Sequence, residues 1–273
     1  MTPLSAFPGG TSLDGGRFVV STRRHGGSRW GIYRGYSRCT RVAGAMLITV
    51  GPRQTRSHAE LLGELALPIA GVAPLVHIGP VAGGPRGDLD GLVEREPGGR
   101  PVSDYMLPLA PGVAMALVRE IGCVLGEIHE REVYLGGLQP HLIYVKAVSG
   151  GLELTGIAPR GPIFAHTAGD AREQPRPFHY SYTPPEGYAG RTGAAADVFS
   201  LCALASHWLT GVHPFQGPRH SMVPQALARE LGGGRSATTR DWPRLIDRGL
   251  SEQPRQRPPL GELVGALEMA QAA

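Results

Sequence analysis

The chain has 273 residues, of which 41% are hydrophobic and 18% charged, and its formal net charge is +4 at pH 7. This length suffices to bury a sizeable core, as one large domain or as two packed lobes, and the composition is that of a soluble globular protein. The 40 glycines and 25 prolines follow no period, which excludes collagen-like repeats.

The longest apolar tract, residues 61–78, contains Glu64, Pro68, Pro74 and His77, which argues against a membrane span. The first 18 residues lack a basic segment followed by an apolar run, which argues against a secretory signal. The three cysteines have no CxxC spacing, so we expect reduced thiols and no zinc site. These features predict a cytoplasmic protein.

The basic residues are almost all arginine, and Lys146 is the only lysine of the chain. No basic run with interleaved aromatic residues occurs, and the best cluster, Arg23 and Arg24 with Arg29, is short. The sequence therefore argues against nucleic acid as a partner.

The N-terminal part is predicted to be rich in strands, with one helix. Apolar runs, alternation and turn residues predict strands at residues 17–20, 31–36, 45–50, 72–78 and 91–95, and helical spacing predicts a helix at 58–67. A turn is expected at residues 25–28. This region ends at the glycines after Pro97, and we place the boundary of the first domain at residue 98.

The remaining domain, residues 99–273, is predicted to be mostly helical. The expected helices are 112–131, 194–210, 222–231, 241–248 and 260–270, with a hairpin of strands at 143–145 and 152–155. A segment rich in Pro, Gly and Arg, residues 159–188, is too long and polar for a compact turn. Loops of this length are usually functional or mobile.

Four segments in this order resemble the protein kinase family, of the bacterial serine/threonine type. The stretch LGEIHEREVYLGGLQPHLIYV resembles the helix and catalytic loop, and YTPPEGYAG resembles the end of the activation segment. AADVFSLCALASHWLTGVHPF resembles the buried helix that follows, and GLSEQPRQRPPLGELVGALE the closing segment. The resemblance covers residues 12–270.

The resemblance implies an α+β, two-lobed kinase-like fold. The expected N-lobe, residues 1–98, is a small antiparallel sheet with one main helix, and the expected C-lobe, residues 99–273, is larger and mostly helical. It also implies three structural residues. Glu186 and Arg257 match a buried ion pair, and Asp197 matches the acid that accepts hydrogen bonds from the catalytic-loop backbone.

Phosphoryl transfer needs a cation on the phosphates, Mg²⁺ held by oxygen ligands, and a base for the incoming hydroxyl. In the catalytic loop, the base position falls on Gly137, the lysine position on Gln139 and the metal-binding asparagine position on Leu142. The aspartate that should follow the hairpin is replaced by Gly156. No aspartate occurs between Asp104 and Asp170 that a shifted alignment could use.

The N-lobe positions are altered in the same way. Leu47 stands where the phosphate-binding lysine is expected, and Glu60 stands at the helix glutamate. Of the three glycines of the phosphate-binding turn only Gly27 is present, and Trp30 occupies a position where the backbone must approach phosphate closely.

The leading hypothesis is therefore a pseudokinase without cofactor or metal that acts as a scaffold or allosteric regulator of another protein. Residues 159–188 and the blocked cleft are its candidate surfaces, and its oligomeric state is left open. One alternative is a divergent active transferase that uses Glu153, Asp170 or Glu173. The other is a module that binds an anionic partner through arginines.

Overall fold

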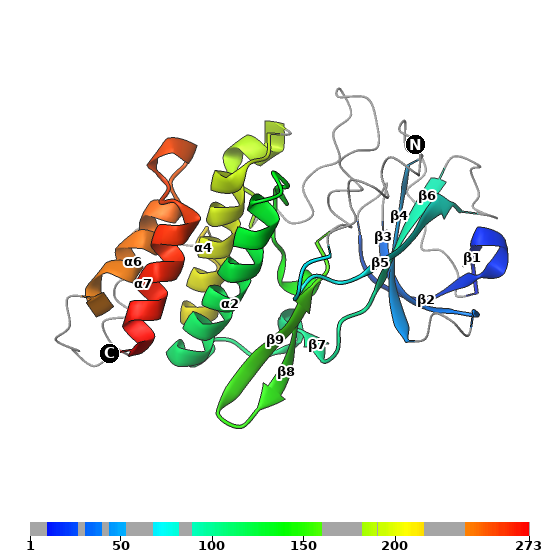
Figure 1. Cartoon of the computed structure of the whole chain (residues 1–273), viewed down its shortest axis with the longest axis horizontal. Helices are drawn as coiled ribbons and strands as arrows, with labels where there is room; N and C mark the ends of the chain where they lie inside the picture. Colours follow the sequence, from blue (N-terminus) through cyan, green and yellow to red (C-terminus); the bar gives the residue numbers. More distant parts are fainter. Residues whose placement is uncertain are drawn as a thin grey trace. The chain divides into compact units, whose positions relative to one another are not determined.

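The computed structural model describes residues 10–26, 31–39, 44–52, 68–81, 89–159, 182–189, 191–215 and 238–272. They form two compact units (Figure 1). The first holds the described residues up to 68, residues 72–81 and 89–97, and residues 157–159. The second holds residues 69–71, 98–156 and the described residues from 182 onward. The helices expected at 58–67 and 222–231, and most of the segment 159–188, lie outside the described residues.

The first unit is a six-stranded antiparallel sheet with the strand order β1-β2-β3-β4-β6-β5. Its strands are β1 (Ser12–Leu13), β2 (Phe18–Gly26), β3 (Gly31–Ser37), β4 (Ala45–Pro52), β5 (Leu75–Pro80) and β6 (Leu89–Arg95). A short 3-10 helix, η1 (Asp14–Gly16), connects β1 to β2.

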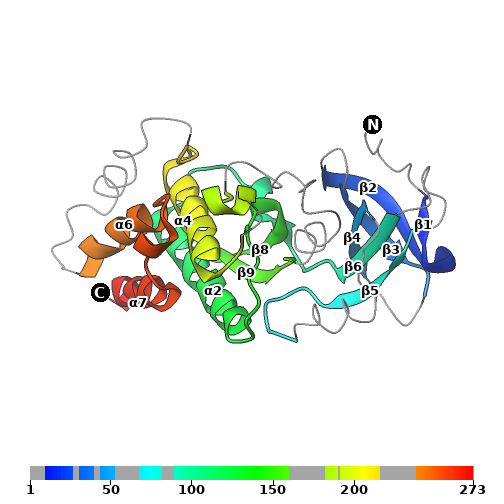
Figure 2. The ribbon, with the colours of Figure 1, turned by 90° about the horizontal axis from the view of Figure 1, so that it is seen from above.

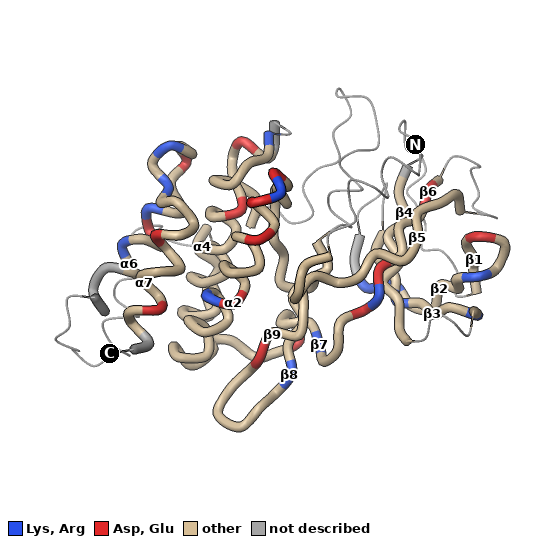
Figure 3. Tube along the Cα trace, in the orientation of Figure 1, with Lys and Arg blue, Asp and Glu red and all other residues tan. Residues whose placement is uncertain are grey.

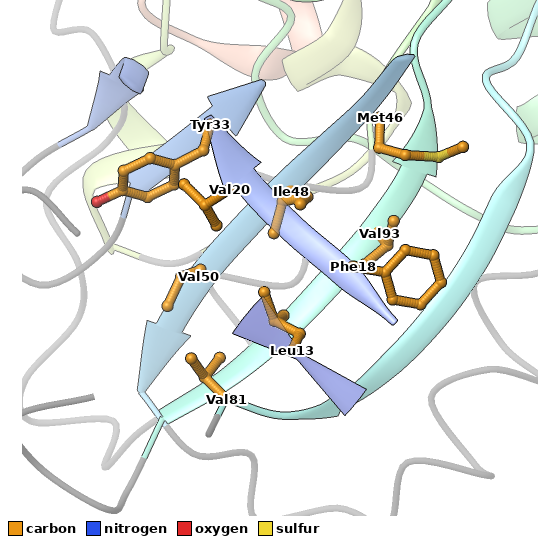
Figure 4. Close-up of a cluster of buried hydrophobic side chains, with 9 residues drawn as sticks. All are labelled: Leu13, Phe18, Val20, Tyr33, Met46, Ile48, Val50, Val81 and Val93. Atoms are coloured by element: carbon orange, nitrogen blue, oxygen red, sulfur yellow. The ribbon is translucent and has the colours of Figure 1, made fainter. Parts of the chain in front are cut away.

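Alternation along the strands gives this sheet an apolar face. On β4, Met46, Ile48 and Val50 point to the same side because successive side chains of a strand point to opposite faces. They pack with side chains from the neighbouring strands into one buried cluster (Figure 4), whose other members are Leu13, Phe18, Val20, Tyr33, Val81 and Val93. This cluster is the core of the first unit.

The second unit combines a three-stranded sheet with four α-helices. Its strands are β7 (Arg100–Pro101), β8 (Ile143–Val148) and β9 (Gly151–Ile157), and its helices are α2 (Pro111–His129), α4 (Ala194–Thr210), α6 (Thr238–Gly249) and α7 (Leu260–Ala272). Four 3-10 helices, η2 (Val102–Asp104), η3 (Pro140–Leu142), η5 (Pro185–Ala189) and η6 (Pro254–Gln256), join them. Helix α2 packs against α4 and α7, and α6 packs against the same two helices (Figures 1 and 2).

Helix α4 is the centre of this helical layer. Thirteen of its 17 residues are buried, including Asp197 and Trp208, which is why it is apolar on nearly every side. It ends at Gly211, whose φ of 70° is left-handed and whose N–H donates to the carbonyl of His207. A glycine cap of this kind ends many helices, because a side chain would be strained there.

The fold class expected from the sequence agrees with these elements, since the chain is α+β with an antiparallel sheet and a helical part. One strand begins later than predicted. Residues 72–78 were expected to form it, but β5 begins at Leu75. Val72 instead forms an isolated parallel bridge to Ile157, and Pro74, which follows it closely, has no N–H to donate to a ladder.

Within the described part of the chain, no helix has both the length and the apolar character needed to cross a membrane.

Replacing Gly249 by alanine should test the contact between α4 and α6. A Cβ there would lie 2.2 Å from Sγ of the buried Cys202 and 3.0 Å from its Cβ. We expect Gly249→Ala to lower the free energy of unfolding by about 1–3 kcal/mol, as overpacking does. The matched control is Gly265→Ala in α7, where a Cβ meets no atom within 4 Å. In urea unfolding, Gly265→Ala should leave the free energy of unfolding unchanged or raise it. An equal decrease of this free energy in both variants would contradict the packing of α4 against α6.

Candidate functional site

A buried carboxylate holds the loop between α2 and η3 in place. The Asp197 side chain is fully buried. Its Oδ2 accepts a hydrogen bond from the N–H of Leu135 at 2.9 Å, and its Oδ1 accepts one from the N–H of Gly136 at 2.8 Å. Nε2 of His129, the last residue of α2, lies 2.9 Å from Oδ2. Two backbone N–H groups of the loop and one imidazole of the preceding helix therefore surround the carboxylate. These polar contacts offset the free-energy cost of burying it.

The two glycines of this loop differ in whether the fold requires a glycine at that position. Gly136 has a φ of 69°, and a Cβ there would lie 2.5 Å from Cγ2 of Thr192. Both the left-handed backbone and the close approach therefore demand glycine. At Gly137, the position expected for a catalytic base, the nearest atoms to a Cβ would be Oγ1 of Thr183 at 3.4 Å and Nε2 of Gln139 at 3.9 Å. Gly137 thus lacks a side chain although the backbone leaves room for one.

The next two positions are buried. Gln139, at the lysine position, is 1% exposed, and its Oε1 has no hydrogen-bond partner among the described residues. Leu142, at the asparagine position, is 2% exposed and ends η3 before β8 begins. An isobutyl group packed in this way offers no lone pair, so Leu142 cannot ligate a hard cation.

Gly156 lies one residue before the end of β9, where the metal-binding aspartate is expected. The hairpin that leads to it carries the only lysine. Nζ of Lys146 on β8 lies 2.9 Å from Oε1 of Glu153 on β9, and both side chains are about half exposed. Glu153 is therefore the solvent-facing strand residue that its position in the hairpin predicts.

In the first unit, Leu47 is buried on β4, on the face opposite Met46 and Ile48. Its register partners are Arg34 on β3 and Glu94 on β6. The other candidate positions of this unit, Gly27, Trp30 and Glu60, lie outside the described residues.

Strand β6 carries two buried acids that the sequence did not reveal. Asp90 and Glu94 are 1% and 2% exposed, and their spacing places them on the same face of the strand. Each makes an interaction within the protein. Glu96, just after the strand, has its carboxylate 2.7 Å from Nε of Arg34 and 3.7 Å from Nη2 of Arg24. Acids in the otherwise apolar run LDGLVER were the available signal.

The structure brings Glu186 and Arg257 together in the second unit. Nη1 and Nη2 of Arg257 donate to the two carboxylate oxygens of Glu186, the second at 2.9 Å. Arg257 also donates to the carbonyls of Ala195 and Ser251, both at 2.9 Å. Its guanidinium group lies 4.9 Å from the ring centroid of Phe199. This ion pair ties η5 to α4 and to the turn before η6.

Next to it is an aromatic cluster that the sequence did not reveal. The hydroxyl of Tyr182 lies 2.6 Å from Nδ1 of His207, and the ring of His213 packs edge-on against Tyr182 at 4.9 Å. The backbone carbonyl of Tyr182 accepts a hydrogen bond from the hydroxyl of Ser200. Burial raises the pKa of Tyr182 to about 12. Residues 182–186 are therefore held to α4 by side chains distant in sequence.

Acidic and basic positions alternate over both units (Figure 3). In the described ranges, no group of three or more His, Cys, Asp or Glu side chains is placed to hold a metal ion.

Breaking the Glu186–Arg257 pair should be costly. The Arg257 side chain is fully buried, so its loss leaves the Glu186 carboxylate without its counter-charge. We expect Arg257→Gln to lower the free energy of unfolding by about 3–5 kcal/mol. The control is Arg255→Gln, which removes an exposed arginine two residues away and should change stability by less than about 0.5 kcal/mol. Similar urea midpoints for the two variants would refute the structural role of this pair.

The raised pKa of Tyr182 predicts a loss of stability at high pH. Since a free tyrosine titrates near 10 and the folded group near 12, the fold favours the neutral hydroxyl. The stabilisation that Tyr182 gains by remaining neutral is fully present below pH 10 and is lost between pH 10 and 12. For a raised pKa of about 12 it amounts to about 2–3 kcal/mol. Unfolding curves of the wild type should therefore fall more steeply over this range than those of Tyr182→Phe. Parallel curves would contradict the assignment.

No family model matches the chain, and no curated protein matches it. Solved structures do. The kinase domain of Mycobacterium tuberculosis PknI superposes with a TM-score of 0.64 at 18% identity, covering 98% of this chain and 100% of that one. Rad53 in complex with AMP-PNP superposes with a TM-score of 0.60 at 16% identity, covering 92% of this chain and 65% of that one. Together with the order of its strands and helices, these similarities show that the chain has a protein kinase-like fold.

Proposed function

We propose that this chain is a catalytically inactive kinase-like domain that acts by binding another protein. The observation that carries the proposal is the loop anchored by Asp197. Its backbone is held by hydrogen bonds, yet Gly137, Leu142 and Gly156 place no side-chain oxygen where a base and two metal ligands are expected.

The missing groups are those on which phosphoryl transfer depends. Catalysis in this fold comes from positioning the phosphates and neutralising their charge rather than from covalent chemistry by the protein. Loss of a single charge-stabilising group typically costs about 10²–10³-fold in rate. Such losses in rate are not additive, so they cannot be multiplied to give a total loss. Here, however, the base and both metal ligands are absent together.

The phosphate-binding cation is absent as well. Leu47 is buried at the expected lysine position, and the only lysine of the chain forms an ion pair with Glu153 on an exposed hairpin. Glu153 is also the one acid of the alternative transferase hypothesis that the structure describes. Its engagement with Lys146 and its exposure favour the inactive domain over that alternative.

A role in protein binding is inferred from what is retained. A kinase-like domain without catalytic groups can still bind another protein through its surface. The fold alone does not specify a function. The ion pair of Glu186 with Arg257 and the contacts of Tyr182 with α4 stabilise the end of the segment that resembles an activation loop. A fixed surface at this end suits a scaffold or allosteric partner, because less conformational entropy is lost when a partner binds.

The first test is nucleotide binding in the presence of metal. We expect the melting temperature of the full chain to change by less than about 1 °C on addition of Mg-ATP, because a ligand that does not bind the native state adds no stability. ATP with EDTA is the matched control, since it separates metal-dependent binding from binding of the nucleotide alone. A shift of several degrees that requires Mg²⁺ would overturn the proposal.

The second test is phosphate transfer. Radiolabelled ATP and generic protein substrates should give no incorporation above a blank without protein. Incorporation that is abolished by Glu153→Gln, and retained by Glu127→Gln as an exposed acid on α2, would favour the divergent transferase instead.

A further inference from the structure

A cavity of about 370 Å³ opens in the second unit, apart from the catalytic-loop positions. It lies between the turn that follows α4 and the chain that joins α6 to η6, the orange-to-red loop of Figure 1. Its lining consists of Pro214, Phe215, Asp247, Arg248, Leu250, Ser251, Glu252 and Gln256. The volume is near the lower end of the range of about 300–1,000 Å³ for ligand pockets, which leaves ample room for a single long side chain.

One wall of the cavity is aromatic and supported from behind. The ring of Phe215 stacks on that of Phe199 with centroids 5.5 Å apart and an interplanar angle of 5°. The guanidinium group of Arg257 lies over Phe199. Phe215 is therefore held by a stack of buried groups, and it presents a fixed apolar surface to the cavity.

The charge of the described lining residues is negative. Asp247 and Glu252 contribute two carboxylates and Arg248 one guanidinium group, and Nη1 of Arg248 is already 2.9 Å from Oε1 of Glu262. The Asp247 side chain makes no hydrogen bond or ion pair among the described residues. An anionic ligand would be repelled, whereas a cation would gain the solvent-exposed carboxylate of Asp247, which has no other partner among the described residues.

The polar part of the wall is fixed by internal hydrogen bonds. The hydroxyl of Ser251 donates to Oε1 of Gln256 at 2.7 Å, and Nε2 of Gln256 donates to Oε1 of Gln253 at 3.1 Å. The carbonyls of Ser251 and Glu252 accept hydrogen bonds from Arg257. Little reorganisation is therefore needed when a ligand enters, which reduces the entropic cost of binding.

We propose that this cavity binds the side chain of an arginine from a partner protein. A guanidinium group is planar, stacks on an aromatic ring and donates several hydrogen bonds to a carboxylate, so it matches Phe215 and Asp247 together. An ammonium group is more strongly hydrated and fits the aromatic wall less well. The inference rests on the proposed function, because it names a chemical feature of the protein partner.

The test uses acetyl-Gly-Arg-Gly-amide as the probe and the full chain as the receptor, with binding followed by calorimetry and by NMR shifts of the Ser251 and Gln256 amides. The matched peptide with citrulline has nearly the same shape without the charge. We expect the arginine peptide to bind about tenfold more tightly than the citrulline peptide, from the loss of a charge-assisted hydrogen bond, and the lysine peptide to bind more weakly than arginine.

The protein controls are Asp247→Asn and Glu127→Gln, which remove the same charge inside the cavity and on an exposed position of α2. Asp247→Asn should abolish the preference for arginine over citrulline, whereas Glu127→Gln should keep it. Equal binding of the arginine and citrulline peptides, or equal effects of the two variants, would overturn the proposal. Because no nucleotide is present, failure here leaves the tests of catalytic inactivity unaffected.

Discussion

The fully buried carboxylate of Asp197 is the constraint on which the second unit depends. It accepts hydrogen bonds from two consecutive backbone N–H groups, of Leu135 and Gly136, and it lies beside the imidazole of His129. A charge buried in helix α4 is tolerated only when such partners surround it. The path of the loop and the position of the helix are therefore set together.

The kinase-like loop keeps its shape without a side chain at position 137. The shape comes from the hydrogen bonds to Asp197, the left-handed glycine at 136 and the burial of framework residues such as Leu138 and Ile143. A proton acceptor at position 137 would add nothing to these interactions, because the space next to Gly137 is bounded only by contacts of 3.4 Å and more. Function and fold are carried by different atoms of the same loop.

The Glu186–Arg257 pair connects the parts of the second unit that are proposed to meet a partner. Arg257 reaches η5 through Glu186, α4 through Ala195, and the wall of the cavity through Ser251. A ligand against Phe215 would lie two aromatic rings away from this arginine, because Phe215 and Phe199 stack between them. Such a continuous chain of packed groups has the physical form through which two surfaces can influence each other.

Much of this architecture was predictable from the sequence. Helix 194–210 was predicted to the residue, and the positions of β4, α2 and the β8–β9 hairpin followed from periodicity and turn residues, because these signals depend on neighbouring residues alone. The residue types at positions 47, 137, 139, 142 and 156 also follow from the sequence, and the catalytic inactivity inferred from them stays a prediction. The late start of β5 was not predicted, since the pairing of Val72 with Ile157 joins residues 85 positions apart.

Only the tertiary structure decided which side chains from distant segments of the chain come together. Tyr182 and His207 meet through their side chains, and Phe215, Asp247 and Ser251 line one cavity. No local pattern marks them, because each contact depends on how helices and turns pack rather than on spacing along the chain. The sequence alone determined that Gly137, Leu142 and Gly156 carry no side-chain oxygen, because glycine and leucine have none in any fold. The packing determined which distant side chains meet.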